Sequence, residues 1–309
     1  MKITPLCISC TLMKRSLELE SLYGDEENNT RLSIMRELLE ATGLYIGPDI
    51  EAAELATVSF RRLRSLAPRV VEMYRTLAAS SMKMAVERAE EIRRTIEDKR
   101  LGDVLEFLLQ TIAASTGYRP LAGHWRLLEE PPSQLDVVSA KKGRIDVEQF
   151  SRLVDEASSS SQPVYYLFAS AHELPYDMLL VEKLVDEGVS VVGVVRGEPF
   201  EDYATAEDLD TVGATNYLED VVEIEAAAAP LEEDSHIVSR MNNAPFVVVK
   251  GCVQSLYFHN NPLKTPMLLA FTAFCPVLVK IFQVPPGSVN AIVASPRGEG
   301  AGEAAGAAK

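Results

Sequence analysis

Hydrophobic positions in the N-terminal part of the chain recur with the periodicity of an α-helix, in which such positions share one face. Leu32, Met35 and Leu38 follow this spacing, and Gly43 then marks a helix end. The same pattern predicts further helices over 52–66, 70–96 and 101–114. We therefore expect residues 1–128 to form an all-helical domain.

The pattern changes after residue 128. Residues 129–162 begin with two glutamates and two prolines, so we expect a connecting segment that ends in a helix over 147–157. From residue 163 onward, short apolar runs alternate with helical spacing. Near-continuous apolar runs are typical of parallel strands that are covered on both faces. The predicted strands lie over 164–168, 189–195, 246–249, 277–281 and 291–294, and a helix over 176–187 separates the first two.

These elements predict a protein of the α/β class, in which a helical domain precedes an α/β domain over 163–295 with a mostly parallel sheet. In such sheets, ligands bind at the carboxyl ends of the strands, which are followed here by residues 169–177, 196–208 and 250–258. Residues 296–309 are rich in glycine and alanine, and we expect them to be disordered.

The formal net charge is −15, from 45 acidic and 30 basic side chains. A charge of this sign argues against binding to nucleic acid or to an anionic membrane surface. The longest apolar run, over 266–279, has 14 residues and contains Pro276, which falls short of the about 18 residues of a membrane span. Because no secretory signal is recognisable, we expect a cytoplasmic protein that does not cross a membrane.

Four cysteines in a chain of 309 residues are too few for a disulfide framework, which fits a reducing compartment. Cys7 and Cys10 form a Cys-x-x-Cys pair that has alternative interpretations. The pair is a redox couple, or it is half of a metal site that Cys252 or Cys275 completes. Alternatively, the two side chains are small hydrophobic groups that pack the first helix onto the rest of the chain.

Short motifs lie where the predicted strands end. Glu173 and Asp177 follow the first strand, an Arg-Gly-x-Pro motif over 196–199 follows the second, and Lys250 and Gly251 follow a later one. Together with the Cys-x-x-Cys pair and a late Cys-Pro step, these motifs resemble those of the damage-control phosphatases, also known as domain of unknown function 89. The resemblance is to the small prokaryotic and archaeal branch, which carries Cys-x-x-Cys near its N-terminus.

The resemblance implies an all-helical cap and a Rossmann-like, three-layer α/β/α domain. It also implies a phosphatase that hydrolyses phosphate monoesters of small metabolites with a divalent metal such as Mg²⁺, Mn²⁺, Co²⁺ or Ni²⁺. The metal ligands of the family are an aspartate and an asparagine after the first strand, and an aspartate in the motif after the second.

The chain departs from the family at these ligand positions. The resemblance places them at Ala169, Ser170 and Tyr203, and Asp202 stands where the family has an asparagine. Alanine offers no ligand atom, and serine and tyrosine offer neutral hydroxyls, whereas Mg²⁺ and similar ions prefer charged oxygen ligands. We therefore expect an impaired or inactive enzyme. The alternative is an altered metal site around Asp202, which His172, Glu173 or Ser170 completes.

The other polar residues at the strand ends are the candidate functional residues. Glu173, Asp177 and Lys250 are the expected catalytic residues, and Arg196 and Gly251 are expected to bind the ligand. A lysine at a strand end neutralises a phosphate, and a glycine lets the backbone approach it closely. Two functions compete with that of a divergent phosphatase: a non-catalytic protein that binds a phosphorylated metabolite, and a scaffold subunit in a homo-oligomer or a protein complex.

Overall fold

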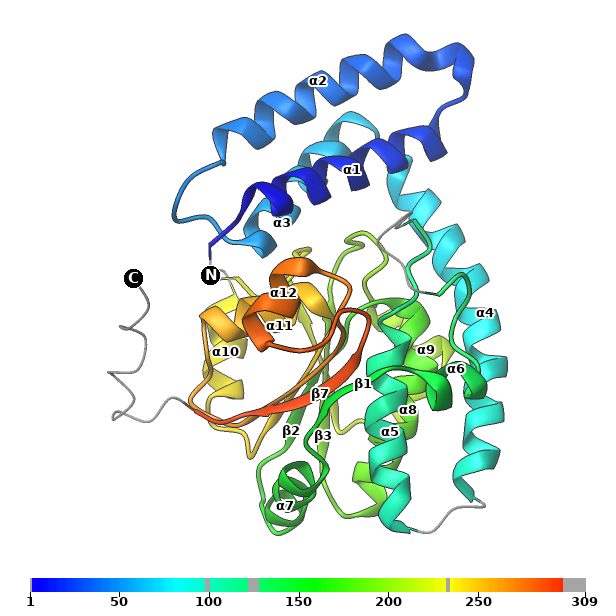
Figure 1. The fold of residues 1–309 in the computed structure, drawn as a ribbon, viewed down its shortest axis with the longest axis vertical. Helices are drawn as coiled ribbons and strands as arrows, with labels where there is room; N and C mark the ends of the chain where they lie inside the picture. The colour runs from blue at the N-terminus through cyan, green and yellow to red at the C-terminus, as the bar shows by residue number, and fades with distance from the viewer. Residues whose placement is uncertain (1, 98–100, 122–127, 232–233, 297–309) are drawn as a thin grey trace.

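The computed structural model describes residues 2–97, 101–121, 128–231 and 234–296. The first part of the chain forms helices α1 (Pro5–Leu22), α2 (Asn28–Leu44), α3 (Ala52–Leu66), α4 (Val70–Glu97) and α5 (Leu101–Ser115). Helices α3, α4 and α5 confirm the three predicted from the spacing of apolar residues. In Figure 1, α1, α2 and α3 project from one end of the molecule as a cap, whereas α4 and α5 run alongside the sheet.

A seven-stranded sheet forms the centre of the rest of the chain, in the order β1-β7-β6-β5-β2-β3-β4. The strands are β1 (Lys142–Ile145), β2 (Val164–Leu167), β3 (Val191–Arg196), β4 (Asp220–Ile224), β5 (Val247–Lys250), β6 (Met267–Thr272) and β7 (Val289–Ala294). All neighbours are parallel except β6 and β7, which confirms the predicted sheet. Since β3 and β5 flank β2, the chain reverses its direction of travel across the sheet here, and such a reversal opens a crevice at the strand ends.

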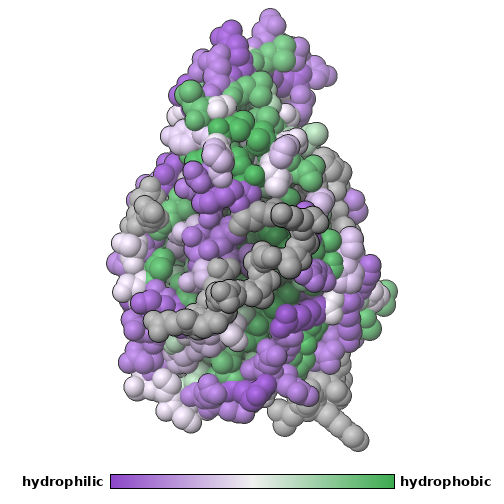
Figure 2. Space-filling view, turned by 60° about the vertical axis from the view of Figure 1, so that its left-hand side comes forward, coloured by the Kyte–Doolittle hydropathy of each residue, from purple (hydrophilic) through white to green (hydrophobic). Residues whose placement is uncertain are grey.

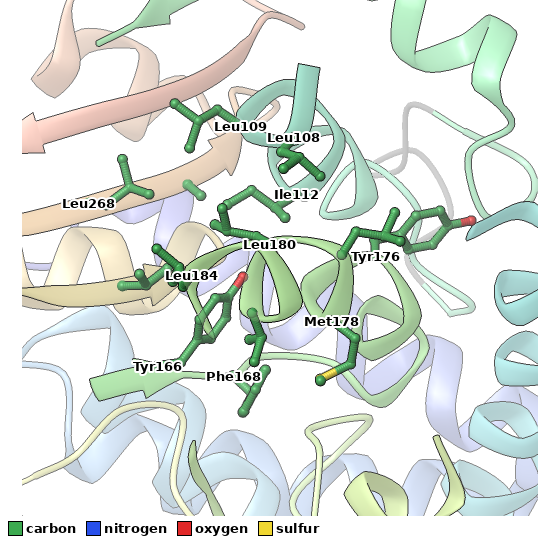
Figure 3. Close-up of a cluster of buried hydrophobic side chains, with 14 of the residues drawn as sticks. Leu108, Leu109, Ile112, Tyr166, Phe168, Tyr176, Met178, Leu180, Leu184 and Leu268 are labelled. Carbon is green, nitrogen blue, oxygen red and sulfur yellow. The ribbon is translucent and has the colours of Figure 1, made fainter. Parts of the chain in front are cut away.

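Helices cover both faces of the sheet, as a three-layer fold requires. The remaining helices are α6 (Gln134–Ser139), α7 (Val147–Ser158), α8 (Leu174–Asp186), α9 (Ala206–Thr211), α10 (Ser235–Met241), α11 (Cys252–Asn260) and α12 (Pro276–Phe282). Side chains alternate along β2, so Tyr166 joins the core under α5 and α8, whereas Leu167 joins the core under α10, α11 and α12. Figure 3 shows Ile112 of α5 and Leu180 of α8 meeting above Tyr166.

A third core joins the cap to the sheet domain. Leu38 and Phe60 of the cap are buried together with Phe200 and Tyr203, which lie in the loop after β3. The ring centres of Phe60 and Phe200 are 5.0 Å apart in an edge-to-face arrangement, which is a favourable geometry for aromatic pairs. The cap is therefore packed against the loop that contains two of the sequence-predicted site residues, Asp202 and Tyr203.

One strand prediction is wrong. Residues 277–281 belong to helix α12, which begins at Pro276 directly after Cys275 as its N-cap residue. A short apolar run does not distinguish a buried strand from a buried helix, and proline is favoured at the first position of a helix. The true strand of this region is β6, and β1 adds a strand within the segment that was expected to connect the domains. The tail predicted to be disordered lies, except for residue 296, outside the described residues.

The molecular surface in Figure 2 is hydrophilic over much of the face shown, and hydrophobic residues are conspicuous in the projecting cap. Leu32, Leu39 and Leu44 of α2 are among the exposed hydrophobic side chains there. Within the part of the chain that the structure describes, no helix is long and apolar enough to cross a membrane.

Candidate functional site

The loops after β2 and β3 are joined by backbone hydrogen bonds at the carboxyl end of the sheet. The amide of Ala204 donates to the carbonyl of Ala169 over 2.7 Å, and the amide of Ala171 donates to the carbonyl of Asp202 over 2.8 Å. Ser170 and Tyr203 pair across the same bridge. The fold therefore brings together the positions at which the resemblance places metal ligands, although they are far apart in the sequence.

The three expected catalytic residues also meet, in a fully buried ion-pair cluster. Lys250 Nζ lies 2.6 Å from Asp177 Oδ1 and 3.1 Å from Glu173 Oε2. It also donates to the carbonyl of Ile112 over 2.6 Å and to the hydroxyl of Ser115 over 3.1 Å. The ammonium group is thus surrounded by protein partners, and a phosphate would have to displace them to reach it.

Burial and crowding shift the protonation of this cluster. Burial raises the pKa of Asp177 to about 7, Lys250 opposes the rise, and the neighbouring Glu173 adds to it. Two carboxylates share one ammonium group, so one of them gains by holding a proton. Tyr166 donates a further hydrogen bond to Asp177 Oδ1 over 2.8 Å. The cluster has the chemistry of a fixed internal network that ties α5, α8 and β5 together.

Arg196 and Gly251, the expected ligand-binding residues, lie at the same end of the sheet. Arg196 is buried and donates to the carbonyls of Ala227 and Phe168 over 2.9 and 3.2 Å, and to Gln254 Oε1 over 2.9 Å. Burial lowers the pKa of its guanidinium to about 10. Gly251 adopts φ 82°, a conformation that favours glycine, and leads into α11. Arg196 thus serves the architecture of the site in this structure.

A cavity of about 160 Å³ lies between the cap and the sheet domain, next to the loop after β3. Of the sequence-predicted site residues, Asp202 and Tyr203 line it, as do all four cysteines. The cavity also reveals three cationic residues that the sequence analysis missed, Lys14, Arg15 and Arg119. Lys14 follows Cys10 by one helical turn, so the spacing along α1 places the two side chains on the same face and could have indicated Lys14. No sequence pattern indicates Arg119, because only the tertiary fold brings this residue to the cavity.

Arg119 and Asp202 have opposite charges and unused hydrogen-bonding capacity. Neither Arg119 Nε nor Asp202 Oδ1 has a hydrogen-bond partner among the described residues. Burial alone would raise the pKa of Asp202, but Lys14, Arg119 and His172 outweigh it and hold the pKa at about 2. Burial lowers the pKa of Arg119, but Asp202 together with Glu173 and other neighbouring groups outweighs it and raises the pKa. Both groups are therefore ionised at the cavity, and the guanidinium lies 5.6 Å from the ring centre of Phe274.

His172 is a buried imidazole directly after β2. Neither of its ring nitrogens has a hydrogen-bond partner among the described residues, and its ring packs edge-on against Tyr118 with the ring centres 4.9 Å apart. Burial lowers the pKa of His172, so the ring is neutral at physiological pH. It does not line the cavity described above.

A buried ionic network fixes the cap to the loop that carries Asp202. Glu201 pairs with both Lys14 and Arg15 of α1, and Arg15 Nε lies 3.1 Å from Glu18 Oε2. Tyr74 of α4 donates to Glu18. Glu201 has φ 50°, an unfavourable backbone angle for a residue other than glycine. The ion pairs therefore hold this loop in a conformation that its backbone alone would disfavour.

The three positions at which the resemblance places metal ligands carry side chains without a charged oxygen. Ala169 offers no ligand atom, Ser170 is neutral, and burial raises the pKa of Tyr203, which keeps its phenol protonated. Asp202 supplies a carboxylate nearby, but the cation Arg119 lies within its electrostatic reach. Among the described residues, no group of three histidine, cysteine, aspartate or glutamate side chains is arranged to hold a metal ion.

The four cysteines are free thiols around the cavity. Burial raises the pKa of Cys10 to about 11 and also raises those of Cys252 and Cys275. A protonated thiol is a poor nucleophile and a poor metal ligand. This environment favours the interpretation of the cysteines as small apolar side chains.

Comparison with known proteins identifies the family. The sequence model of the damage-control phosphatase ARMT1-like domain matches residues 3–289. The uncharacterized protein MJ0202 of Methanocaldococcus jannaschii is 20% identical over 288 residues, which cover 89% of this chain and 90% of that protein. A crystal structure of a DUF89 family protein (PH1575) from Pyrococcus horikoshii has the same fold, with a TM-score of 0.76, 18% identity, and coverage of 94% of this chain and 99% of that one. The chain belongs to the damage-control phosphatase ARMT1-like domain family.

Proposed function

We propose that this chain binds a small phosphate monoester without turning it over, and that side-chain cations replace the family's metal in that role. The observation that carries the proposal is Arg119, whose guanidinium reaches the cavity with an unpartnered Nε. It interacts electrostatically with Tyr203, a position at which the resemblance places a metal ligand and which offers only a protonated phenol. Guanidinium groups match the geometry of phosphate oxygens and form strong bidentate hydrogen bonds with them.

Charge balance supports an anionic ligand. Among the described residues, three cationic side chains and two carboxylates line the cavity. Arg15 and Lys14 are already paired with Glu201, so Arg119 is the cation best placed to receive a phosphate. This charge pattern is local, because the chain as a whole carries a net charge of −15.

The geometry favours binding over hydrolysis. The family is metal-dependent in general. A metal in a phosphatase neutralises phosphate oxygens and activates the attacking water. Arg119 supplies the first effect but cannot supply the second. Glu173 and Asp177, the carboxylates that would act as base or acid, are paired with Lys250 away from the cavity.

The proposal is tested by calorimetric titration of phosphate monoesters in the presence of a chelator, with wild-type protein, Arg119→Ala and, as a matched control, Arg75→Ala on the exposed face of α4. We expect binding to survive chelation and to weaken about tenfold or more in Arg119→Ala alone, because a charged hydrogen-bonding group is lost. Metal-stimulated release of phosphate by the wild type, abolished by the chelator, would overturn the proposal in favour of a divergent phosphatase.

A further inference from the structure

We infer that the bound phosphate ester has a short apolar body rather than a sugar, an inference that rests on the proposed function. The charged residues of the cavity interact with one another through ion pairs or at longer range. Lys14 and Arg15 both pair with Glu201, and Asp202 follows Glu201 in the chain and interacts electrostatically with Arg119. One polar region therefore receives the phosphate, and the rest of the lining meets the body of the ligand.

Most of the rest of the lining is apolar. It includes Leu6 of α1, Ala56 of α3, Val253 and Leu256 of α11, and Phe274 and Val277 around the start of α12. Apolar side chains from four separate helices thus face one small space. A hydrocarbon body that enters this space is removed from water on several sides, which favours binding in proportion to its buried area.

The four thiols extend this apolar surface. Cys7 and Cys10 reach the cavity from the first two turns of α1, Cys252 from the first residue of α11, and Cys275 from the N-cap of α12. Burial keeps Cys10, Cys252 and Cys275 protonated. A neutral thiol behaves as a small, polarisable hydrophobic group and is a weak hydrogen-bond donor. Cys252 Sγ, moreover, already donates to the carbonyl of Thr272 over 3.2 Å.

A sugar would find few partners here. Among the described lining residues, the uncharged hydroxyl groups belong to Thr11, Tyr74 and Tyr203, and that of Tyr74 already donates to Glu18. Every sugar hydroxyl that is buried without a partner costs free energy, and this cost selects against hydroxyl-rich ligands. The cavity of about 160 Å³ also lies below the ~300–1,000 Å³ of sites for drug-sized ligands, which points to a compact ligand.

The test is calorimetric titration in chelator with propyl, butyl, pentyl and hexyl phosphate, glucose 6-phosphate, inorganic phosphate and 1-hexanol. We expect each added methylene to tighten binding about fourfold until the cavity is filled. Glucose 6-phosphate should bind more weakly than pentyl phosphate. An affinity that does not change along the alkyl series, or tighter binding of glucose 6-phosphate than of pentyl phosphate, would overturn the inference of an apolar ligand body. Neither result would contradict the proposed function.

A substitution in the apolar lining of the cavity tests the contact with the ligand's hydrocarbon body without disturbing the fold. Val253→Thr keeps the shape of the side chain but places a hydroxyl in the lining, and Val86→Thr on the exposed face of α4 is its control. We expect Val253→Thr to weaken the binding of hexyl phosphate about threefold to tenfold and to leave the affinity for inorganic phosphate unchanged. Equal affinity of 1-hexanol and hexyl phosphate, unaffected by Arg119→Ala, would overturn the proposed function, and so would a failure of every phosphate to bind.

Discussion

Lys250 Nζ lies 2.6 Å from Asp177 Oδ1, and both side chains are fully buried. The lysine that was expected to neutralise a phosphate, from its place at a strand end, is therefore paired with an aspartate on the first turn of α8. Removing one partner of such a pair leaves the other as an uncompensated charge in a low-dielectric interior. This relationship makes Lys250 a stability determinant, whatever the cavity binds.

Replacement of Lys250 by methionine should destabilise the fold by about 3–5 kcal/mol, because Asp177 and Glu173 lose their shared cation. The free energy of unfolding, measured by urea denaturation, checks this. Lys183→Met, which removes a surface pair with Glu187, is the control and should change it by about 1 kcal/mol or less. A similar small loss in Lys250→Met would contradict the role of the buried cluster.

The protonation of Asp177 should make stability depend on pH. Its pKa is raised from 3.8 to about 7, so above pH 3.8 the folded state holds a proton that the unfolded state releases. Its contribution to stability is therefore full below pH 3.8 and is lost as the pH rises to about 7. Asp177→Asn cannot titrate, so the stability of the wild type relative to this variant should fall across that window. Denaturation curves at several pH values check this, and a constant difference would be the contrary result.

His172 acts in the opposite direction. Burial lowers its pKa, so the unfolded state takes up the proton first, and its contribution to stability is lost as the pH falls below 6.5. Because this contribution is common to the wild type and to Asp177→Asn, it cancels in their difference. The comparison of the two proteins thus removes the contribution of His172 and leaves that of the cluster around Asp177.

The unit from β2 through α8 to β3 was predictable because each element buries a nearly continuous apolar surface. Strand β4 was missed, since it lies at the edge of the sheet and exposes polar side chains such as Glu223. Strand β6 and helix α12 lie within one long apolar stretch, where hydrophobicity alone does not distinguish strand from helix.

The part of the candidate site that directly follows the predicted strands could be located from the sequence. Glu173, Asp177 and Lys250 do meet, as strand-end motifs suggested, but their mutual pairing depends on depth in the fold, which the sequence pattern does not give. Arg119 was missed because it lies in a turn after α5, without a motif or periodicity. Its place at the cavity depends on how α5 packs on the sheet, and that is a tertiary property.

The end of α12 offers a test of backbone strain away from the site. Gln283 is exposed and adopts φ 53° as the C-cap residue, a conformation in which glycine is favoured. Gln283→Gly should therefore stabilise the protein by about 0.5–1 kcal/mol. Thermal unfolding checks this, with Gln283→Ala as a control that keeps a Cβ and should show little gain. Destabilisation by the glycine would mean that the glutamine side chain contributes more than its backbone angle costs.

Asp202→Asn distinguishes an anion site from a rebuilt metal site. If Arg119 receives a phosphate, the ionised carboxylate of Asp202 repels it, since the pKa of Asp202 is held at about 2. Its neutralisation should tighten the binding of hexyl phosphate in chelator about fivefold or more, as the removal of a like charge at close range predicts. Calorimetry measures the change, and Asp155→Asn on the exposed face of α7 is the control. A metal site centred on Asp202 predicts the reverse. Wild-type protein incubated with Mg²⁺, Mn²⁺, Co²⁺ or Ni²⁺ and then desalted would retain stoichiometric metal, and Asp202→Asn would lose it.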